Sequence, residues 1–318
     1  MTEQGLHNQI IPKAKGIINE VKKAVIGKDD IIIKTLLAII AGGHILLDDI
    51  PGVGKTTLAV AFSKAMSLDY KRMQFTPDVM PADVTGFNVY NKQTGQFEYK
   101  EGAAMCSLFL ADEINRTSSK TQSALLEVME EGAVTVDGVT RVLPRPFIVI
   151  ATQNPIGSVG TQMLPESQLD RFLMKLSVGY PDIDSEISIM KAKASASAED
   201  SVCAVASRQD IIMLRNAAEE IFADDKIYRY IASLAAATRE HPKLKLGLSP
   251  RGTLALSAAA KASALLHGRT FVIPDDISYI FEDVSAHRII LTAKAKASGY
   301  DTKSVLEDIL ASVPAPKI

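Results

Sequence analysis

Hydrophobic and polar positions alternate between two periods in the first half of the chain. Helical spacing of apolar residues predicts helices over residues 29–41 and 55–66, the first ending at Gly42-Gly43. Short, mainly apolar runs predict buried strands over residues 44–47, 107–111 and 146–151, and residues 72–75 could form a further strand. Such runs are typical of parallel strands whose two faces are covered by helices. Strands alternating with helices therefore predict an α/β fold with a parallel sheet.

Two hairpin signals interrupt this alternation. Asp137-Gly138 separates Val134 and Val136 from Val139, and Asp-Gly suits a type I′ turn. Residues 87–90 and 96–99 flank a looser turn of the same kind. Because the sheet does not need either hairpin, we expect both to be insertions on the α/β core.

The pattern changes after Tyr180-Pro181, where helical spacing predominates. The predicted helices cover residues 183–194, 211–222, 227–238, 253–266 and 274–286, and we find no strand signal of comparable strength there. We therefore expect an α/β domain over residues 1–180 and a smaller, all-helical domain over residues 181–318.

Composition narrows the function classes. The 318 residues include 35 Lys and Arg against 37 Asp and Glu, so charge gives no reason to expect a nucleic acid or an anionic membrane as partner. The apolar stretch 31–47 is interrupted by Lys34 and His44, which argues against membrane insertion. Cys106 and Cys203 cannot form a disulfide framework or a Cys/His metal cluster. These features predict a cytoplasmic protein in a reducing compartment.

The strongest chemical signal lies between the strand at 44–47 and the helix at 55–66: Pro51-Gly-Val-Gly-Lys-Thr-Thr57. In a P-loop, backbone N–H groups surround the phosphates, the Lys reaches the terminal phosphates and the Ser or Thr holds Mg²⁺. Gly54, Lys55 and Thr56 fit this pattern, whereas Asp49 stands where its first Gly belongs. The alternative is a Pro-Gly turn that happens to precede a helix, and the strand-loop-helix context disfavours it.

An apolar strand ending in Asp112-Glu113 is the second signal. A carboxylate at a strand end beside a P-loop can hold Mg²⁺ through its water shell, and an adjacent Glu can activate the attacking water. By itself the pair could be a solvated turn, but downstream of a P-loop the functional interpretation is favoured.

Three further residues are candidates with open alternatives. Asn154 follows the next apolar strand and could bind the γ-phosphate or the attacking water, or it could initiate an Asn-Pro turn. Arg171 could stabilise the charge of the transition state, or form an ion pair with Asp170 or Glu166. Arg251 has the same candidate role, or lies in a solvated first helical turn.

A GTPase-like pair of motifs, at residues 83–86 and 91–94, is rejected. Thr94 stands where a carboxylate would read guanine, and the two motifs are too close to lie on separate βα units. We therefore do not expect GTP specificity.

In this order, the motifs resemble those of the MoxR family of AAA+ ATPases over about residues 20–290. The resemblance is carried by Val25-Ile-Gly27, Gly42-Gly-His-Ile-Leu-Leu47, Pro51-Gly-Val-Gly-Lys-Thr-Thr57, Gln74-Phe-Thr-Pro-Asp78, Pro81-Ala-Asp-Val-Thr-Gly86, Ala111-Asp-Glu-Ile-Asn-Arg116, Lys120-Thr-Gln-Ser-Ala-Leu-Leu-Glu127, Ala151-Thr-Gln-Asn-Pro155, Leu164-Pro-Glu-Ser-Gln-Leu-Asp-Arg-Phe172 and Ser249-Pro-Arg251.

The resemblance implies an AAA+ P-loop core with a five-stranded parallel sheet and hairpin inserts, followed by a small all-α lid. It also implies roles for individual residues. Val25, Ile26 and Gly27 would contact adenine, while Gly52, Val53, Gly54, Lys55, Thr56 and Thr57 would hold the phosphates of ATP. Thr56 and Asp112 would hold Mg²⁺, and Glu113 would be the catalytic base. Asn154 would be sensor 1, and Arg251 would be the sensor 2 of the lid. Arg171 would be the arginine finger that is given to a neighbouring subunit.

The expected function is that of an ATP-hydrolysing chaperone that remodels a protein client. The resemblance further implies a homo-oligomeric ring, hexameric by analogy, and a partner with a von Willebrand factor A domain. One alternative is a nucleic-acid-dependent motor, but Asp137-Gly138 is acidic and residues 91–95 contain only Lys92 as a basic residue. The other is a nucleotide-switched scaffold without turnover, which the presence of Glu113, Asn154 and Arg171 disfavours.

Overall fold

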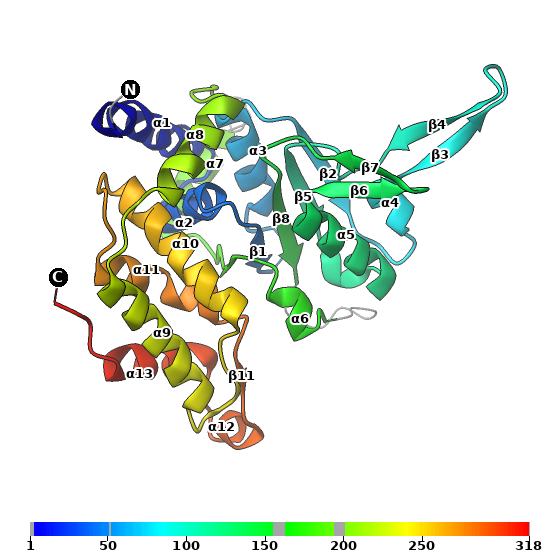
Figure 1. The fold of residues 1–318 in the computed structure, drawn as a ribbon. Coiled ribbons are helices and arrows are strands. Elements are labelled where there is room, and N and C mark those ends of the chain that lie inside the picture. Colours follow the sequence, from blue (N-terminus) through cyan, green and yellow to red (C-terminus); the bar gives the residue numbers. More distant parts are fainter. Residues whose placement is uncertain (1–2, 51, 155–162, 194–200, 318) are drawn as a thin grey trace.

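The core of the protein is a parallel sheet. The computed structural model describes residues 3–50, 52–154, 163–193 and 201–317. Within these residues the main sheet has five strands in the order β2-β5-β8-β1-β9, all neighbours parallel (Figure 1). Their bounds are β1 Ile45–Asp48, β2 Tyr70–Gln74, β5 Leu108–Asp112, β8 Ile148–Gln153 and β9 Met174–Leu176. The predicted α/β fold with a five-stranded parallel sheet is confirmed.

Each face of this sheet packs into its own hydrophobic core. Alternate strand residues belong to different clusters: Ile45 and Leu47 to one, Leu46 to the other. The first cluster includes residues from α1 (Glu3–Ala24), α2 (Asp29–Ile40) and α3 (Lys55–Ala65), the second from α4 (Pro81–Thr85) and α5 (Ser119–Glu131). Burial on both faces explains why β1, β5 and β8 read as mainly apolar runs, whereas the edge strand β2 is only partly buried.

The two predicted hairpins are present as inserts outside the main sheet. They are β3 Gly86–Asn91 with β4 Gln96–Glu101, and β6 Ala133–Val136 with β7 Val139–Val142. Asp137 and Gly138 both have positive φ, as a type I′ turn requires. The β3–β4 hairpin projects from the body (Figure 1), and its base is joined to the other hairpin where Asn88 donates to Asp137 at 2.7 Å.

The remainder of the chain is mostly helical. Its helices are α6 Glu166–Leu169, α7 Ile183–Lys193, α8 Arg208–Glu219, α9 Asp225–Glu240, α10 Pro250–Leu266, α11 Pro274–Ser285, α12 Ala293–Ala297 and α13 Thr302–Ser312. The expected absence of strands here is corrected by β10 (Leu244–Leu246) and β11 (Ile290–Leu291), an antiparallel pair too short to produce a period. The helical lid is confirmed with this addition.

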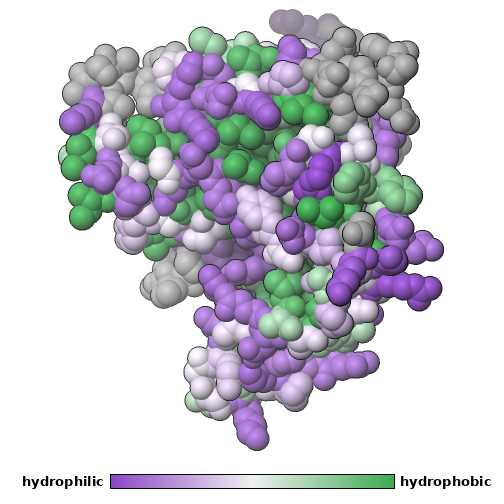
Figure 2. All heavy atoms as spheres, turned by 90° about the vertical axis from the view of Figure 1, so that its left-hand side faces the viewer, coloured by the Kyte–Doolittle hydropathy of each residue, from purple (hydrophilic) through white to green (hydrophobic). Residues whose placement is uncertain are grey.

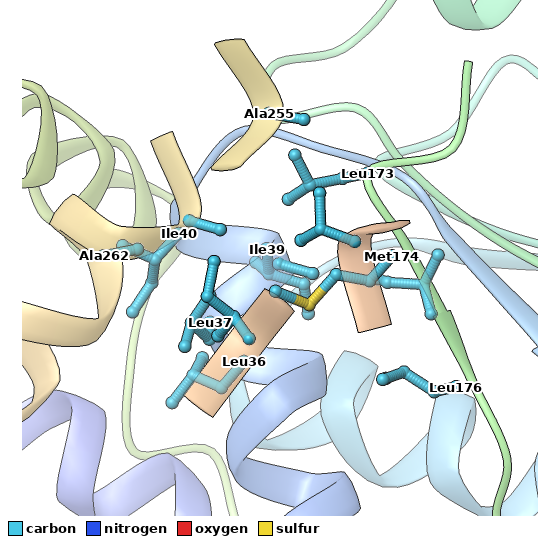
Figure 3. Packing of buried hydrophobic residues seen from close by; sticks show 14 of the residues in the cluster. Leu36, Leu37, Ile39, Ile40, Leu173, Met174, Leu176, Ala255 and Ala262 are labelled. Carbon is cyan, nitrogen blue, oxygen red and sulfur yellow. The ribbon is translucent and has the colours of Figure 1, made fainter. Parts of the chain in front are cut away.

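Lid and core share one apolar cluster. In Figure 3, Leu36, Leu37, Ile39 and Ile40 of α2 lie among residues at β9 and on α10. Helix α1, which the sequence pattern did not predict, packs on α3 as well as on α8 and α10. The domain boundary near Pro181 therefore stays a prediction, because packing is continuous across it.

Nothing in the described part of the chain forms a helix with the length and hydrophobicity needed to cross a bilayer. The face drawn in Figure 2 mixes hydrophobic and hydrophilic groups. Its lower end, where Figure 1 places α12 and α13, is mostly hydrophilic.

Candidate nucleotide site

The loop between β1 and α3 has an open concave face. Gly52 and Gly54 have φ values of 87° and 91°, and a Cβ added at either would meet no atom within 4 Å. Gly54 caps α3 without a side-chain hydrogen bond, and the first turn of this helix has no acidic residue. The positive end of the helix dipole therefore faces this loop without a carboxylate from the first turn, which favours an anion there. Pro51 and Pro155, both in the quoted motifs, lie outside the described residues.

Lys55 is placed at the centre of the predicted site. The residue is only 8% exposed, and its Nζ donates to the backbone oxygen of Asp49 at 2.7 Å and to Oδ1 of Asn154 at 3.4 Å. Burial lowers the pKa of Lys55, while Asp49, Asp112 and Glu113 oppose this shift. The ammonium of Lys55 thus lies near carboxylates. A bound phosphate would take over part of the negative charge that these carboxylates supply to it.

The acidic pair ends β5 as predicted. Asp112 is the last strand residue, and Glu113 has left-handed backbone angles of φ 56° and ψ 50°, which non-glycine residues adopt mainly where surrounding structure imposes them. The hydroxyl of Thr152 donates to Asp112 Oδ1 at 2.6 Å and accepts the N–H of Glu113 at 2.8 Å. Thr152 therefore fixes both acids, a role that the sequence analysis missed although the residue lies in the quoted motif with Asn154.

Two arginines that the sequence analysis also missed contact these acids. Arg72, in the middle of β2, donates to Asp112 Oδ2 at 2.7 Å. Arg116 donates to Glu113 Oε2 at 2.7 Å. No local pattern marks Arg72, because its contact with Asp112 follows from the pairing of β2 with β5, and strand order had to be known first.

Asn154 lies in the site and joins its two halves. Its Nδ2 donates to Glu113 Oε1 at 3.0 Å, and its Oδ1 accepts from Lys55. Lys55, Glu113 and Asn154, which follow three different strands, thus converge at the carboxyl edge of the sheet. This is the edge where ligands bind in open α/β sheets.

A cavity of about 230 Å³ runs beside this edge. One wall contains Gly52, Val53, Gly54 and Thr57; the other contains Ala24, Val25, Ile26, Lys28, Pro181 and Ile189. Val25 and Ile26 line this cavity, and their contact with adenine stays a prediction. Gly27 instead packs closely, since a Cβ there would lie 2.0 Å from the hydroxyl of Ser185.

Arg171 and Arg251 lie at the opposite edge of the sheet. Arg171 precedes β9, and its guanidinium donates to the backbone oxygen of Leu126 at 2.9 Å and pairs with Glu130. Arg251, in the first turn of α10, pairs with the same Glu130. The end of α5 that carries Glu130 is held beside the start of β1, where His44 Nε2 bonds the oxygen of Met129 at 3.0 Å.

These positions correct two expected alternatives. The ion-pair partner of Arg171 is Glu130 and not Asp170 or Glu166; Asp170 pairs with Arg288 at 2.7 Å. Arg251 is partly exposed but is not simply solvated, because Glu130 holds it. Neither arginine contacts the phosphate loop of its own chain among the interactions of the described residues.

The donor set suits ATP and Mg²⁺. Thr56, in the first turn of α3, and Asp112 supply the hydroxyl and carboxylate oxygens that Mg²⁺ prefers. The described residues contain no cluster of three His, Cys, Asp or Glu that would instead indicate a metal site built entirely of protein ligands. The open glycine loop and the positive end of α3, whose first turn has no acidic residue, fit a polyphosphate.

Comparisons with known proteins agree with this geometry. Residues 44–174 match the model of the ATPase family associated with various cellular activities (AAA), and residues 236–309 match the AAA lid domain. The chain is 47% identical to YeaC of Bacillus subtilis (strain 168) over 94% of this chain and 93% of that protein. It is 36% identical to Chaperone MoxR1 of Mycobacterium tuberculosis (strain ATCC 25618 / H37Rv), over 95% and 82% of the two chains.

A solved structure has the same fold. The crystal structure of a protein proposed to be an ATPase from Cytophaga hutchinsonii ATCC 33406 superposes with a TM-score of 0.92 at 38% identity, over 98% of both chains. Sequence and structural relatives therefore agree over nearly the whole length. The chain belongs to the MoxR family of AAA+ ATPases.

Proposed function

We propose that this protein binds ATP with Mg²⁺ and hydrolyses it. The observation that carries the proposal is the convergence of Lys55, Asp112, Glu113 and Asn154 beside an open glycine loop. Gly52 to Thr57 would hold the phosphates, with Lys55 at the terminal ones, and Val25 to Gly27 would border the base. A bound Mg²⁺ would neutralise phosphate charge and be held by Thr56 and Asp112.

Glu113 is the proposed base. Its carboxylate is held by Asn154 and Arg116, so its direction is set before an attacking water arrives. Glu113 would take a proton from that water, while Asn154 would orient it and Lys55 would stabilise the leaving phosphate charge.

We propose that the active unit is a ring, most simply a hexamer. Arg171 and Arg251 lie at the amino edge of the sheet, away from the phosphate loop of their own chain. A head-to-tail contact brings one surface of a subunit against a different surface of the next, and successive contacts of this kind can close into a ring. In such a ring Arg171, the proposed finger, and Arg251, the proposed sensor 2, would reach the nucleotide of the neighbour.

The proposed substrate of this motor is a protein. The similarity to Chaperone MoxR1 supports it, as does the near balance of 35 basic and 37 acidic residues. A von Willebrand factor A-domain protein is the proposed partner, the cytoplasm is the proposed location, and residues 1–180 and 181–318 are the proposed core and lid. Stimulation of ATP hydrolysis by DNA or RNA would favour a nucleic-acid motor instead.

Two variants test the ATPase. Lys55→Ala should lose ATP binding in a fluorescent-nucleotide titration, and Glu113→Gln should bind ATP but release no phosphate. Tight ATP binding by the first variant would refute the P-loop assignment, and turnover by the second at the wild-type rate would refute the base. The scaffold alternative predicts that the unchanged protein binds ATP without releasing phosphate.

A further inference from the structure

Asp49, the residue that departs from the P-loop pattern, has a buried carboxylate with an unusual set of partners. It is 6% exposed. Its Oδ1 accepts from the Ser177 hydroxyl at 2.9 Å and from the Gly179 N–H at 3.2 Å, and its Oδ2 accepts from the Val178 N–H. All three donors belong to residues 177–179, the connector that leaves β9.

The conformation of Asp49 does not require glycine. It is not among the described residues with positive φ, whereas Gly52 and Gly54 are. Its backbone joins other parts of the site: the N–H donates to Gln153 at the end of β8, and the oxygen accepts from Lys55. The carboxylate is therefore an addition to a loop whose turn forms without it.

The connector that Asp49 holds leads directly to the second wall of the cavity. Lys28 donates to the backbone oxygen of Tyr180 at 2.8 Å, and Asp182 accepts the N–H of Ser185 at 2.7 Å in the first turn of α7. Pro181 and Ile189, at the start and middle of this segment, line the cavity. Gly52 and Gly54, on the other wall, lie three and five residues after Asp49.

We propose that Asp49 is a positioning residue that fixes the two walls of the nucleotide cavity relative to each other. This inference rests on the proposed ATP-binding function. A ligand that contacts both walls binds more tightly when their relative position is fixed in advance. Once such a ligand has bound to one wall, the other wall is already in place to contact it. A ligand that contacts only the glycine loop gains nothing from that fixed position.

Asp49→Asn removes the link with little change in shape. Whichever way the amide is turned, one backbone N–H of the connector faces its NH₂ group instead of an oxygen. Asp49→Ala is the second variant, since it removes the acceptors without adding a donor. Lys175→Gln is the matched control, because the ion pair of Lys175 with Asp48 at 3.1 Å also joins β9 to β1 but does not bond the connector.

The experiment compares ATP, which spans both walls, with inorganic triphosphate, which reaches only the loop, as competitors of a fluorescent ADP. Loss of one buried backbone hydrogen bond should weaken ATP binding by about tenfold. Triphosphate binding should not weaken, since the loop itself is unchanged and the loss of the negative charge of Asp49 does not disfavour an anion. Hydrogen exchange at Val178 and Gly179 should also accelerate in both Asp49 variants and stay unchanged in Lys175→Gln.

Two results would overturn the inference. One is wild-type ATP affinity in both Asp49 variants. The other is an equal loss of ATP and triphosphate binding, which would mean that Asp49 supports the loop itself. If the unchanged protein binds no ATP, the proposed function fails first and the inference with it, so the two failures are distinguishable.

Discussion

Arginine 171 gives the sharpest test of the proposed ring, because its structural and catalytic roles predict different magnitudes. Its side chain is 31% exposed and that of Glu130 is 38% exposed, so their ion pair is partly screened by solvent. Such a pair contributes up to about 1 kcal/mol to stability. A finger supplied in trans is worth about 10³-fold or more in hydrolysis rate, or about 4 kcal/mol. We expect Arg171→Ala to retain the fold and ATP binding and to lose hydrolysis.

Mixing subunits measures whether Arg171 acts across an interface. Arg171→Ala subunits keep a complete phosphate loop, and Lys55→Ala subunits keep Arg171. In a random one-to-one mixture, about half of the subunits have the complete loop and about half of their neighbours have the arginine. Phosphate release should therefore recover to about a quarter of the wild-type rate, whereas each variant alone should be almost inactive.

The matched control is Lys243→Ala, which removes an exposed ion pair with Asp308 and a contact with the ring of Tyr300, both within residues 243–308. It should keep both stability and hydrolysis. No recovery at any mixing ratio would refute the trans role of Arg171. A loss of several kcal/mol of unfolding free energy in Arg171→Ala would show that the arginine is mainly structural.

Three further predictions follow from contacts in and near the site. Thr152→Val leaves Asp112 Oδ1 and the Glu113 N–H without a partner, so chemical denaturation should show that the free energy of unfolding falls by about 2–4 kcal/mol. The exposed Thr135→Val is the control and should lose almost none, so equal losses would contradict this prediction. Arg72→Gln removes the cation that competes with Mg²⁺ for Asp112, so the Mg²⁺ concentration for half-maximal hydrolysis should fall about 3- to 10-fold. An unchanged concentration would exclude competition between Arg72 and the metal. Burial lowers the pKa of His44 to about 4, so the neutral imidazole contributes stability that is fully present above pH 6.5. As the pH falls from 6.5 toward 4, the free energy of unfolding should decrease by about 3 kcal/mol. His44→Gln should show a shallower pH dependence of unfolding over that window, and an equal slope would refute the assignment.

Much of the fold was predictable because its signals are local. The strand at β5 and the turn at Asp137-Gly138 follow from a few neighbouring residues. β9, by contrast, has three residues and β11 two, so neither spans enough positions to show a period. Helix α1 contains Pro12, which reads as a helix-breaking residue.

The candidate site shows the same division. Lys55, Glu113 and Asn154 each follow a strand and Asp112 ends one, so all four could be identified from motifs and order. The groups that hold them could not, because Arg72 and Thr152 meet Asp112 across 40 residues of sequence. That meeting requires the strand order and its register, which no local pattern contains.

The separation between the two groups of residues also supports the proposed ring. Lys55 and Glu113 follow strands at the carboxyl edge of the sheet, while Arg171 precedes β9 at the amino edge. Helix α5 begins at Ser119, so Glu130 lies about 16 Å along it from the end nearest Glu113. The arginines are also tied to the lid, because Asp170 beside Arg171 accepts from Ser249 at 2.8 Å, and Ser249 caps the helix that carries Arg251. We therefore expect lid movement in one subunit to shift both arginines together, so that it changes hydrolysis at its neighbour before it changes hydrolysis at its own site.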